Sequence, residues 1–208
     1  NMTHRSSCCL CDIALGKGKF GLIDKPFMES DSYVAIASIG TFIEGWSMIV
    51  PKEHFLSLSS NYNDEEFLLF TSQVINHIEV VFGNTIMFEH GANEEGSLTG
   101  CGVDHAHFHI VPQRTSLLPN LLSGPLTWHN YRKEESYKLS EKNDYLFYAT
   151  ELSMDGIKGM YANPKKPISQ YFRKQLAIKN NLLEHADYNQ FPYLNNAKQT
   201  YNKLRLTR

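Results

Sequence analysis

The chain has 208 residues, of which 42% are hydrophobic and 20% are charged, and its net charge is −2. This balance is ordinary for a globular protein and gives no strong field toward nucleic acid or a membrane surface, although local basic patches stay compatible with it. No apolar run approaches the roughly 20 residues of a membrane-spanning helix. Residues 1–7 lack the apolar stretch of a signal peptide, which indicates a cytoplasmic protein.

Three of the four cysteines are crowded near the start of the chain. Cys8, Cys9 and Cys11 lie within four consecutive positions, and the fourth cysteine is Cys101. A disulfide framework would spread its cysteines along the chain. In a reducing compartment the cluster therefore indicates a metal site or free thiols.

The first regular elements are predicted between residues 33 and 91. Strands are expected at residues 33–39 and 46–50, with a turn between Gly40 and Gly45. A helix is expected at residues 64–82, with Asp64 at its start and Gly83 after its end. Its buried stripe at helical spacing comprises Phe67, Phe70, Val74, Ile78 and Val81. Residues 85–89 read as a third strand, and residues 90–104 as a Gly-rich loop.

Three histidines alternate with apolar residues on the next expected strand. They are His105, His107 and His109. Side chains two apart share one face of a strand, so the three imidazoles are expected to point one way. The intervening side chains, which would point into a core, are Ala106, Phe108 and Ile110. The imidazole row indicates a polar site on the sheet; the alternative is a row of histidines on a solvated face.

After residue 114 the sequence pattern becomes less regular and more polar. Residues 115–143 look irregular, residues 145–151 and 156–162 read as a hairpin, and a helix is expected at about 169–183. The last 20 or so residues are polar and rich in Asn. Since few β-α-β alternations occur, the order of elements favours an α+β fold with an antiparallel sheet.

The histidine row suits phosphoryl or nucleotidyl transfer. A neutral imidazole is a competent nucleophile at pH 7, so the middle histidine could attack phosphorus while its neighbour binds a non-bridging oxygen. The Gly-rich loop before it could offer backbone N–H groups to the anion. The loop could equally be a simple connection.

Three sequence blocks resemble one family. Residues 105–111, His-Ala-His-Phe-His-Ile-Val, resemble the His-x-His-x-His signature of the histidine-triad (HIT) superfamily. Residues 45–54, Gly-Trp-Ser-Met-Ile-Val-Pro-Lys-Glu-His, resemble its Gly-His-x-Leu-Val-Ile-Pro-Lys-x-His block. Cys8-x-x-Cys11-x-Ile13 is similar to the N-terminal Cys-x-x-Cys of many bacterial members. The three blocks stand in family order over about residues 8–114.

The resemblance implies a HIT-like antiparallel sheet with a long helix packed on it, in a nucleotide-binding catalytic domain at residues 1–114. Residues 115–208 would form an extension packed on it or next to it. His107 would attack the α-phosphorus to form a nucleotidyl-histidine, and His109 would contact the phosphate. The implied reaction is hydrolysis of a dinucleoside polyphosphate or a nucleoside phosphoramidate. A nucleotidyltransferase or phosphorylase, and a non-catalytic nucleotide- or RNA-binding protein, stay open, as does a homodimer.

The chain departs from the family pattern around the triad. Trp46 stands where many members carry His, and Cys101 and Gly102 stand where related hydrolases place Gln and Ser. These changes leave the identity of the leaving group open. The residues expected to bind substrate are His90, Gly91, Gly100, Cys101, Gly102 and Gln170. His90 could instead make a local structural hydrogen bond, and residues 169–173 could simply begin a helix, although Gln170 or Arg173 could reach the nucleotide.

A structural zinc ion is implied by the zinc-containing relatives. The matching ligands here are Cys8, Cys11, His54 and His105, two thiolates and two imidazoles as Zn²⁺ prefers. The alternatives are ordinary thiols, or Cys9 in place of Cys8 as a poorer match. If His105 binds zinc, His107 and His109 are left for catalysis.

Overall fold

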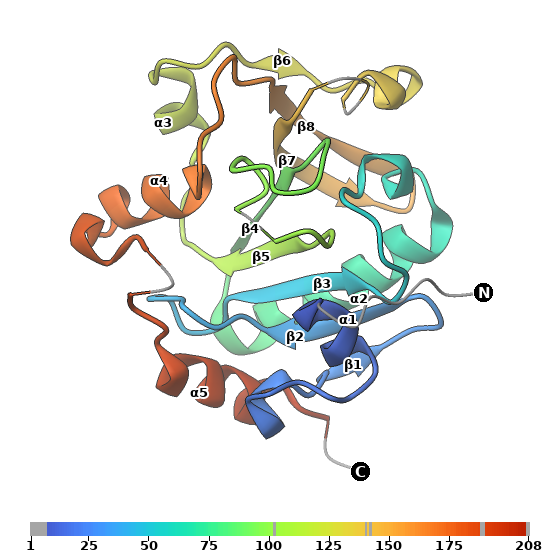
Figure 1. Cartoon of the computed structure of the whole chain (residues 1–208), viewed down its shortest axis with the longest axis vertical. Helices are drawn as coiled ribbons and strands as arrows, with labels where there is room; N and C mark the ends of the chain where they lie inside the picture. Colours follow the sequence, from blue (N-terminus) through green and yellow to red (C-terminus); the bar gives the residue numbers. More distant parts are fainter. Residues whose placement is uncertain (1–7, 102, 140, 142, 188–189, 207–208) are drawn as a thin grey trace.

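The fold is built around one antiparallel sheet, which agrees with the expected α+β class (Figure 1). The computed structural model describes residues 8–101, 103–139, 141, 143–187 and 190–206. Within them the eight strands follow the order β1-β2-β3-β5-β4-β7-β8-β6. They are β1 (Met28–Glu29), β2 (Tyr33–Ala37), β3 (Ser47–Pro51), β4 (Thr85–Gly91), β5 (Phe108–Pro112), β6 (His129–Asn130), β7 (Tyr145–Ser153) and β8 (Gly156–Ala162).

Helices cover both faces of the sheet. The α-helices are α1 (Cys9–Ala14), α2 (Glu65–Phe82), α3 (Leu118–Leu122), α4 (Tyr171–Lys179) and α5 (Leu194–Leu204), and the 3-10 turns are η1 (Gly21–Asp24), η2 (Ser59–Asn61), η3 (Lys133–Lys138) and η4 (Leu183–His185). α2 and α5 pack on one face, where the largest core lies. α1, α3 and α4 pack on the other face, over two smaller cores. No helix in the described part of the chain is long and apolar enough to cross a membrane.

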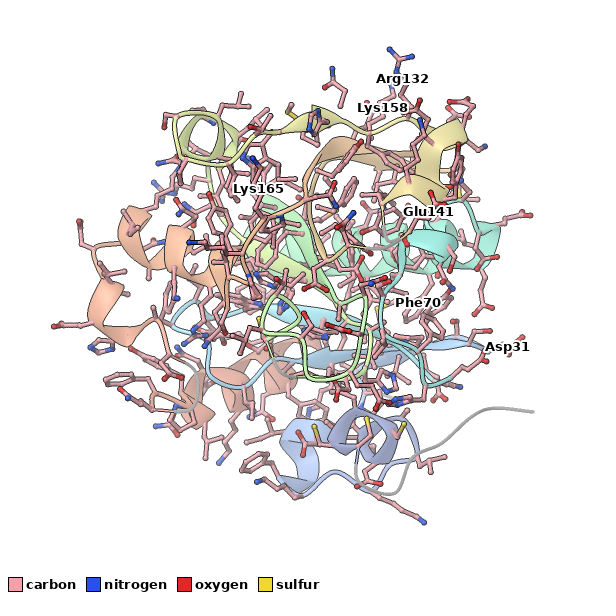
Figure 2. The ribbon with its side chains drawn as sticks, turned by 45° about the horizontal axis from the view of Figure 1, so that its top comes forward. Asp31, Phe70, Arg132, Glu141, Lys158 and Lys165 are labelled. Carbon is pink, nitrogen blue, oxygen red and sulfur yellow. The ribbon has the colours of Figure 1, made fainter. Side chains whose placement is uncertain are left out.

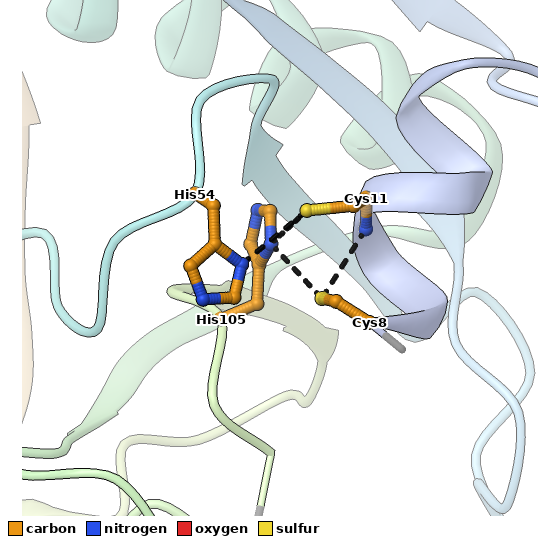
Figure 3. A group of neighbouring side chains, drawn as sticks. All are labelled: Cys8, Cys11, His54 and His105. Carbon is orange, nitrogen blue, oxygen red and sulfur yellow. Dashed lines mark hydrogen bonds between the residues drawn. The ribbon is translucent and has the colours of Figure 1, made fainter. Parts of the chain in front are cut away.

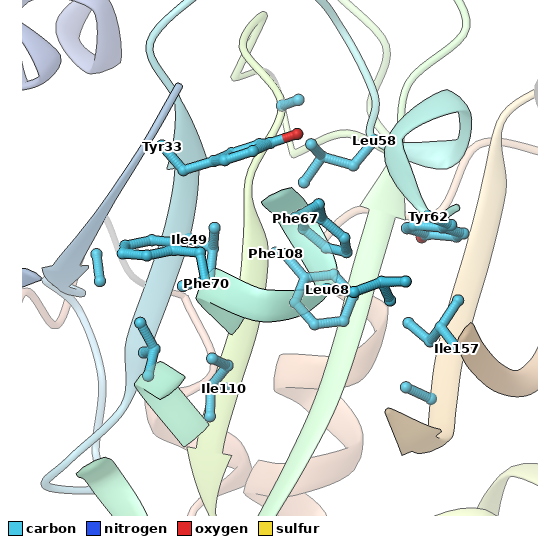
Figure 4. Packing of buried hydrophobic residues seen from close by; sticks show 14 of the residues in the cluster. Tyr33, Ile49, Leu58, Tyr62, Phe67, Leu68, Phe70, Phe108, Ile110 and Ile157 are labelled. Carbon is cyan, nitrogen blue, oxygen red and sulfur yellow. The ribbon is translucent and has the colours of Figure 1, made fainter. Parts of the chain in front are cut away.

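The long helix α2 forms as its sequence predicts, except at its last turn. The Asp64 carboxylate caps its N-terminus by accepting a hydrogen bond from the Phe67 amide over 3.2 Å. Its apolar stripe faces the aromatic core that Figure 4 shows around Phe67 and Phe108. The expectation that Val81 is buried is wrong, because its side chain is 42% exposed. Phe82, which lies four residues after Ile78, packs against this core instead.

The histidine strand is shorter than expected. β5 begins at Phe108, so His105 and His107 precede it and only His109 lies within the strand. The backbone just before β5 makes its hydrogen bond outside the sheet: the Ala106 amide donates to the Phe55 carbonyl over 2.7 Å. The predicted alternation still holds for the apolar side chains. Those in the main core are Ala106, Phe108 and Ile110.

The region after residue 114 continues the same sheet. The predicted hairpin forms as β7 and β8, and β7 pairs with β4 in the register Phe88↔Tyr148. The segment at 115–143 is less irregular than expected, because it contains α3, β6 and η3. The helix expected at 169–183 stops at Lys179, and Asn181 follows in a left-handed conformation (φ 58°). The division at residue 114 stays a prediction.

α5 was not expected from the polar C-terminal sequence. Its buried side chains, Ala197, Thr200, Tyr201 and Leu204, are separated by Asn, Lys and Gln residues. The Thr200 hydroxyl accepts a hydrogen bond from the Gly45 amide over 2.8 Å. α5 therefore supports the turn that leads into Trp46.

Candidate functional site

Cys8, the N-cap of α1, and Cys11, within α1, meet two histidines from the sheet side of the molecule. Figure 3 shows Cys8 and Cys11 facing His54 and His105. The Cys8 Sγ lies 3.3 Å from the His105 Nδ1. The Cys11 Sγ lies 3.3 Å from the His54 Nδ1 and 3.4 Å from the His105 Nδ1. The four candidate ligand atoms all lie within 4.8 Å of one another.

This geometry can hold a metal ion. Tetrahedral zinc with Zn–S near 2.3 Å and Zn–N near 2.0–2.1 Å separates a sulfur from a nitrogen by about 3.5 Å, close to the observed spacings. The His105 Nε2–H donates to the Pro51 carbonyl over 2.7 Å. That bond leaves the Nδ1 lone pair facing the two thiols, which is the way metal-binding histidines are usually oriented.

Burial raises the pKa of the Cys8 thiol to about 11, and the neighbouring Cys11 adds to the rise. Without a cation the Cys8 thiol is therefore neutral at pH 7. A bound cation reverses that preference, because thiolates are the form that ligates metals. Cys9, the alternative ligand, lies at the exposed surface of α1 and is not among the four clustered residues.

Beside this cluster lies a cavity of about 520 Å³. It is bounded by α1 and η1 on one side and by α4 on the other, over β2 and β3. Apolar side chains from the first side include Leu10, Ile13 and Phe20. Three of the expected site histidines line it, namely His90, His107 and His109.

His107 is held as one tautomer. Its Nδ1 lies 2.9 Å from the backbone carbonyl of His105, which can only accept. Nδ1 therefore carries the proton, and Nε2 carries the lone pair. Burial lowers the pKa of this imidazole, so it is neutral at pH 7. A neutral imidazole with an exposed lone pair is the reactive form of histidine.

His109 is held as the opposite tautomer. The Trp46 indole Nε1–H donates to its Nδ1 over 2.9 Å, so the proton of neutral His109 resides on Nε2. Burial lowers the pKa of His109 well below its usual value. The electrostatic influence of the neighbouring His107, His90 and Arg173 lowers this pKa further. Trp46 thus provides a donor at the position where the family resemblance leads one to expect histidine.

His90 lies on β4 and also lines the cavity. Its Nε2 accepts a hydrogen bond from the Phe172 amide at the start of α4, over 3.1 Å. Burial, with a smaller contribution from His107, lowers its pKa to about 3, which keeps the ring neutral. Its Nδ1–H is buried, with no hydrogen-bond partner among the described residues. The local structural bond and an available donor therefore coexist in one side chain.

The remaining candidates for substrate binding are divided. Cys101 and Gln170 line the cavity, and both have left-handed backbones (φ 61° and 54°). Gly91 and Gly100 are not among the described residues that line the cavity. Gly91 instead packs against the Tyr145 ring, where an added Cβ would lie 2.1 Å from a ring atom. Gly102 lies outside the described residues.

Phe20 and Arg173 also line the cavity. Phe20 faces the cavity, whereas its neighbours Ile23 and Phe27 pack in the main core. Arg173, from α4, lines the cavity and is only 5% exposed. The sequence named Arg173 as able to reach the nucleotide, and the structure adds that its side chain is buried.

No family model matches the chain. It is 29% identical over 111 residues to an uncharacterized HIT-like protein of Mycoplasma genitalium, covering 52% of this chain and 74% of that protein. It is 27% identical over 106 residues to an uncharacterized HIT-like protein of Methanocaldococcus jannaschii, covering 51% and 78%. The chain is thus similar to HIT-like proteins over about half its length.

Proposed function

We propose that the protein is a HIT-type enzyme that cleaves a nucleotide at its α-phosphorus through a nucleotidyl-histidine. The observation that supports this most is the pair of opposite tautomers in one cavity. His107 offers a lone pair on Nε2, and His109 offers an Nε2–H donor. A nucleophile beside a phosphate donor is what in-line attack on phosphorus requires.

The reaction proceeds in two displacements. In the first, the His107 Nε2 forms a bond to the α-phosphorus while the bond to the leaving group breaks, and the leaving group departs with the electron pair. The positive charge that develops on the ring is stabilised by the Nδ1–H bond to the His105 carbonyl. In the second, water attacks phosphorus, the electron pair returns to Nε2, and a proton passes to solvent.

The apolar side of the cavity supports a nucleotide substrate. Leu10, Ile13 and Phe20 form a surface suited to the face of a nucleobase. From there a phosphate could reach the histidines that line the same cavity. The similarity to HIT-like proteins agrees with this reading.

We also propose that zinc is the metal of the Cys8, Cys11, His54 and His105 cluster, and that its role is structural. When bound, it supplies a cross-link between α1 and the segments that carry the histidines. Since α1 also forms one wall of the cavity, the cross-link would keep that wall in place.

The test is a panel of substrates with identified products. It includes diadenosine polyphosphates, adenosine phosphoramidates, adenylylated lysine and nucleoside-diphosphate sugars, each with and without inorganic phosphate. His107→Ala is expected to abolish turnover and leave nucleotide binding largely intact, whereas His129→Ala, at an exposed strand position, serves as the control. Intact-mass analysis of a slowed variant is expected to detect the nucleotidyl-enzyme.

Each class of function gives a different outcome. Release of a nucleoside monophosphate without added phosphate indicates hydrolysis, and a requirement for phosphate or another acceptor indicates phosphorolysis or transfer. Binding without turnover of any substrate would favour the non-catalytic reading. Equal activity of His107→Ala and the parent would rule out the proposed mechanism.

A further inference from the structure

Glu89 places a carboxylate in the main core, on the face of β4 opposite to His90. It is fully buried, and so are Tyr62 and Tyr145, which belong to that core. The phenolic O–H groups of both tyrosines donate to the Glu89 Oε1. Because successive side chains of a strand point to opposite faces, this carboxylate and the cavity histidine beside it in sequence lie on different sides of the sheet.

The second oxygen of Glu89 bonds a different part of the chain. The Glu89 Oε2 accepts a buried hydrogen bond from the Leu58 amide over 2.8 Å. Burying a carboxylate is costly unless hydrogen bonds offset its desolvation, as three donors do here. An apolar side chain of similar volume would fill the same space without that cost. The carboxylate therefore adds something else, a fixed attachment between β4 and the segment that ends at Leu58.

This segment, residues 52–58, contacts both halves of the candidate site. It lies outside the helices and strands and carries His54 of the metal cluster. Its Phe55 carbonyl accepts the hydrogen bond from the Ala106 amide over 2.7 Å. Ala106 stands between His105 and His107 in the sequence, and the carbonyl just before it holds the Nδ1 of the proposed nucleophile. A displacement of the segment would thus be transmitted to the metal cluster and to the reacting imidazole.

We propose that Glu89 is a positioning residue for the candidate site. Through the Leu58 amide it fixes the segment that presents His54 to the metal and binds the backbone beside His107. This inference rests on the proposed function, because it takes His54 as a zinc ligand and His107 as the nucleophile. It assigns a role at the site to a side chain that is not among the described residues lining the cavity.

The test compares two changes in one hydrogen-bond network. Glu89→Met removes the acceptor of all three bonds and is expected to weaken zinc binding, measured by competition with a chelator, about 10-fold or more. It should lower kcat on the preferred substrate at least about 10-fold with little change in KM, because a misplaced nucleophile impairs the reacting geometry more than binding. Tyr145→Phe removes only one donor to Oε1. It should lower Tm but keep zinc affinity and kcat within about 3-fold of the parent. Glu141→Gln, at an exposed position, is the control for loss of a carboxylate (Figure 2).

Two further changes isolate the bond to Leu58. Glu89→Gln still offers one oxygen to this amide, while its NH2 group can donate to the tyrosine hydroxyls. It should therefore restore most of the zinc affinity and kcat lost in Glu89→Met. Replacing Leu58 by its α-hydroxy acid analogue turns the amide into an ester, which removes the donor and leaves both side chains in place. The ester protein should lose zinc affinity and kcat as Glu89→Met does, and it decides the question if Glu89→Met does not fold.

The outcomes separate this inference from the function on which it rests. Unchanged zinc affinity and kcat in folded Glu89→Met, or in the ester protein, would overturn the role of Glu89 and leave the proposed function standing. Equal losses in Tyr145→Phe would mean that the carboxylate only supports the core, and would overturn that role too. A parent protein that neither contains zinc nor turns over any nucleotide would overturn both.

Discussion

The Trp46 indole donates its Nε1–H to the His109 Nδ1 over 2.9 Å, in a site closed to solvent on both sides of the bond. The two residues come from neighbouring parts of the sheet, Trp46 just before β3 and His109 within β5. The bond decides which nitrogen of His109 carries the proton toward the cavity. It therefore connects a residue that departs from the family pattern to the chemistry expected of that pattern.

Trp46→Phe is expected to lower kcat/KM by about 10- to 100-fold, because a buried acceptor left without its donor costs roughly 1–3 kcal/mol and frees His109 to adopt the other tautomer. Trp46→His, which can again donate to Nδ1, should retain more activity than Trp46→Phe. Steady-state kinetics on the preferred substrate, with ¹⁵N chemical shifts of the His109 ring as a second readout, measure both effects. An unchanged ring tautomer in Trp46→Phe would contradict the role assigned to the indole.

If the cluster of Cys8, Cys11, His54 and His105 holds zinc as proposed, the composition and stability of the protein depend on the metal. Purified protein that has never met a chelator should contain about one zinc ion per chain, and Cys11→Ser should contain almost none. Because a structural zinc contributes folding free energy directly, chelation should lower Tm markedly. Cys9→Ser, an exposed cysteine on the same helix, should keep both its zinc and its Tm. Metal analysis and calorimetry check this; a parent protein with no zinc would refute the assignment.

Acid should destabilise the protein partly through His90. Burial lowers its folded pKa to about 3, while an unfolded histidine titrates near pH 6.5. Between these values the unfolded state binds one more proton than the folded state, so stability falls as pH falls below about 6.5. His90→Gln, which can still accept from the Phe172 amide, should lessen this fall by roughly 1 kcal/mol per pH unit.

Urea unfolding of the parent and His90→Gln at several pH values between 6.5 and 4.5 measures this difference. Comparing the two proteins removes the contributions of other groups, among them Glu89, whose burial raises its folded pKa to about 7 and acts in the opposite sense. Parallel stability curves for the two proteins would argue against a neutral, buried His90.

Two valines on α2 allow burial to be tested within one helix. Val74 is fully buried, whereas Val80 is 87% exposed. Val74→Ala should lower the free energy of unfolding by about 2–3 kcal/mol, from lost burial plus the cavity left behind. Val80→Ala should change it by no more than about 0.5 kcal/mol. The small gain in helix propensity is shared by both variants, so the difference in urea midpoints reports burial alone. Similar midpoints would mean that α2 packs otherwise.

Local patterns in the sequence predict much of the fold. The period of apolar residues identifies α2, and the alternation at residues 106–110 identifies which side chains of the histidine segment face the core. The hairpin of β7 and β8 follows from its strand-forming residues and turn. Such patterns fail where packing partners are distant: α5 carries few apolar residues, and its stability comes from contacts with α2, β2 and η1.

Only part of the candidate site could be predicted from the sequence. The four cluster residues could be proposed from their family-like positions, and the fold brings them together. The Trp46–His109 bond and the burial of Arg173 depend on how segments more than 60 residues apart meet, which no local spacing encodes. For His90, neither feature could be predicted from sequence. Its structural hydrogen bond depends on where α4 begins, and its buried Nδ1–H depends on the shape of the cavity.

The pairing of β4 with β7 has a consequence for how the protein is made. β4 carries His90, and its outer edge is completed only by a strand from residues 145–153. A ribosome releases β4 well before β7, so for that interval the nascent chain presents an unpaired strand edge, a template for contact with other chains. Slow or interrupted translation beyond residue 112 should therefore favour aggregation, and holdase chaperones should be needed most while that edge is bare.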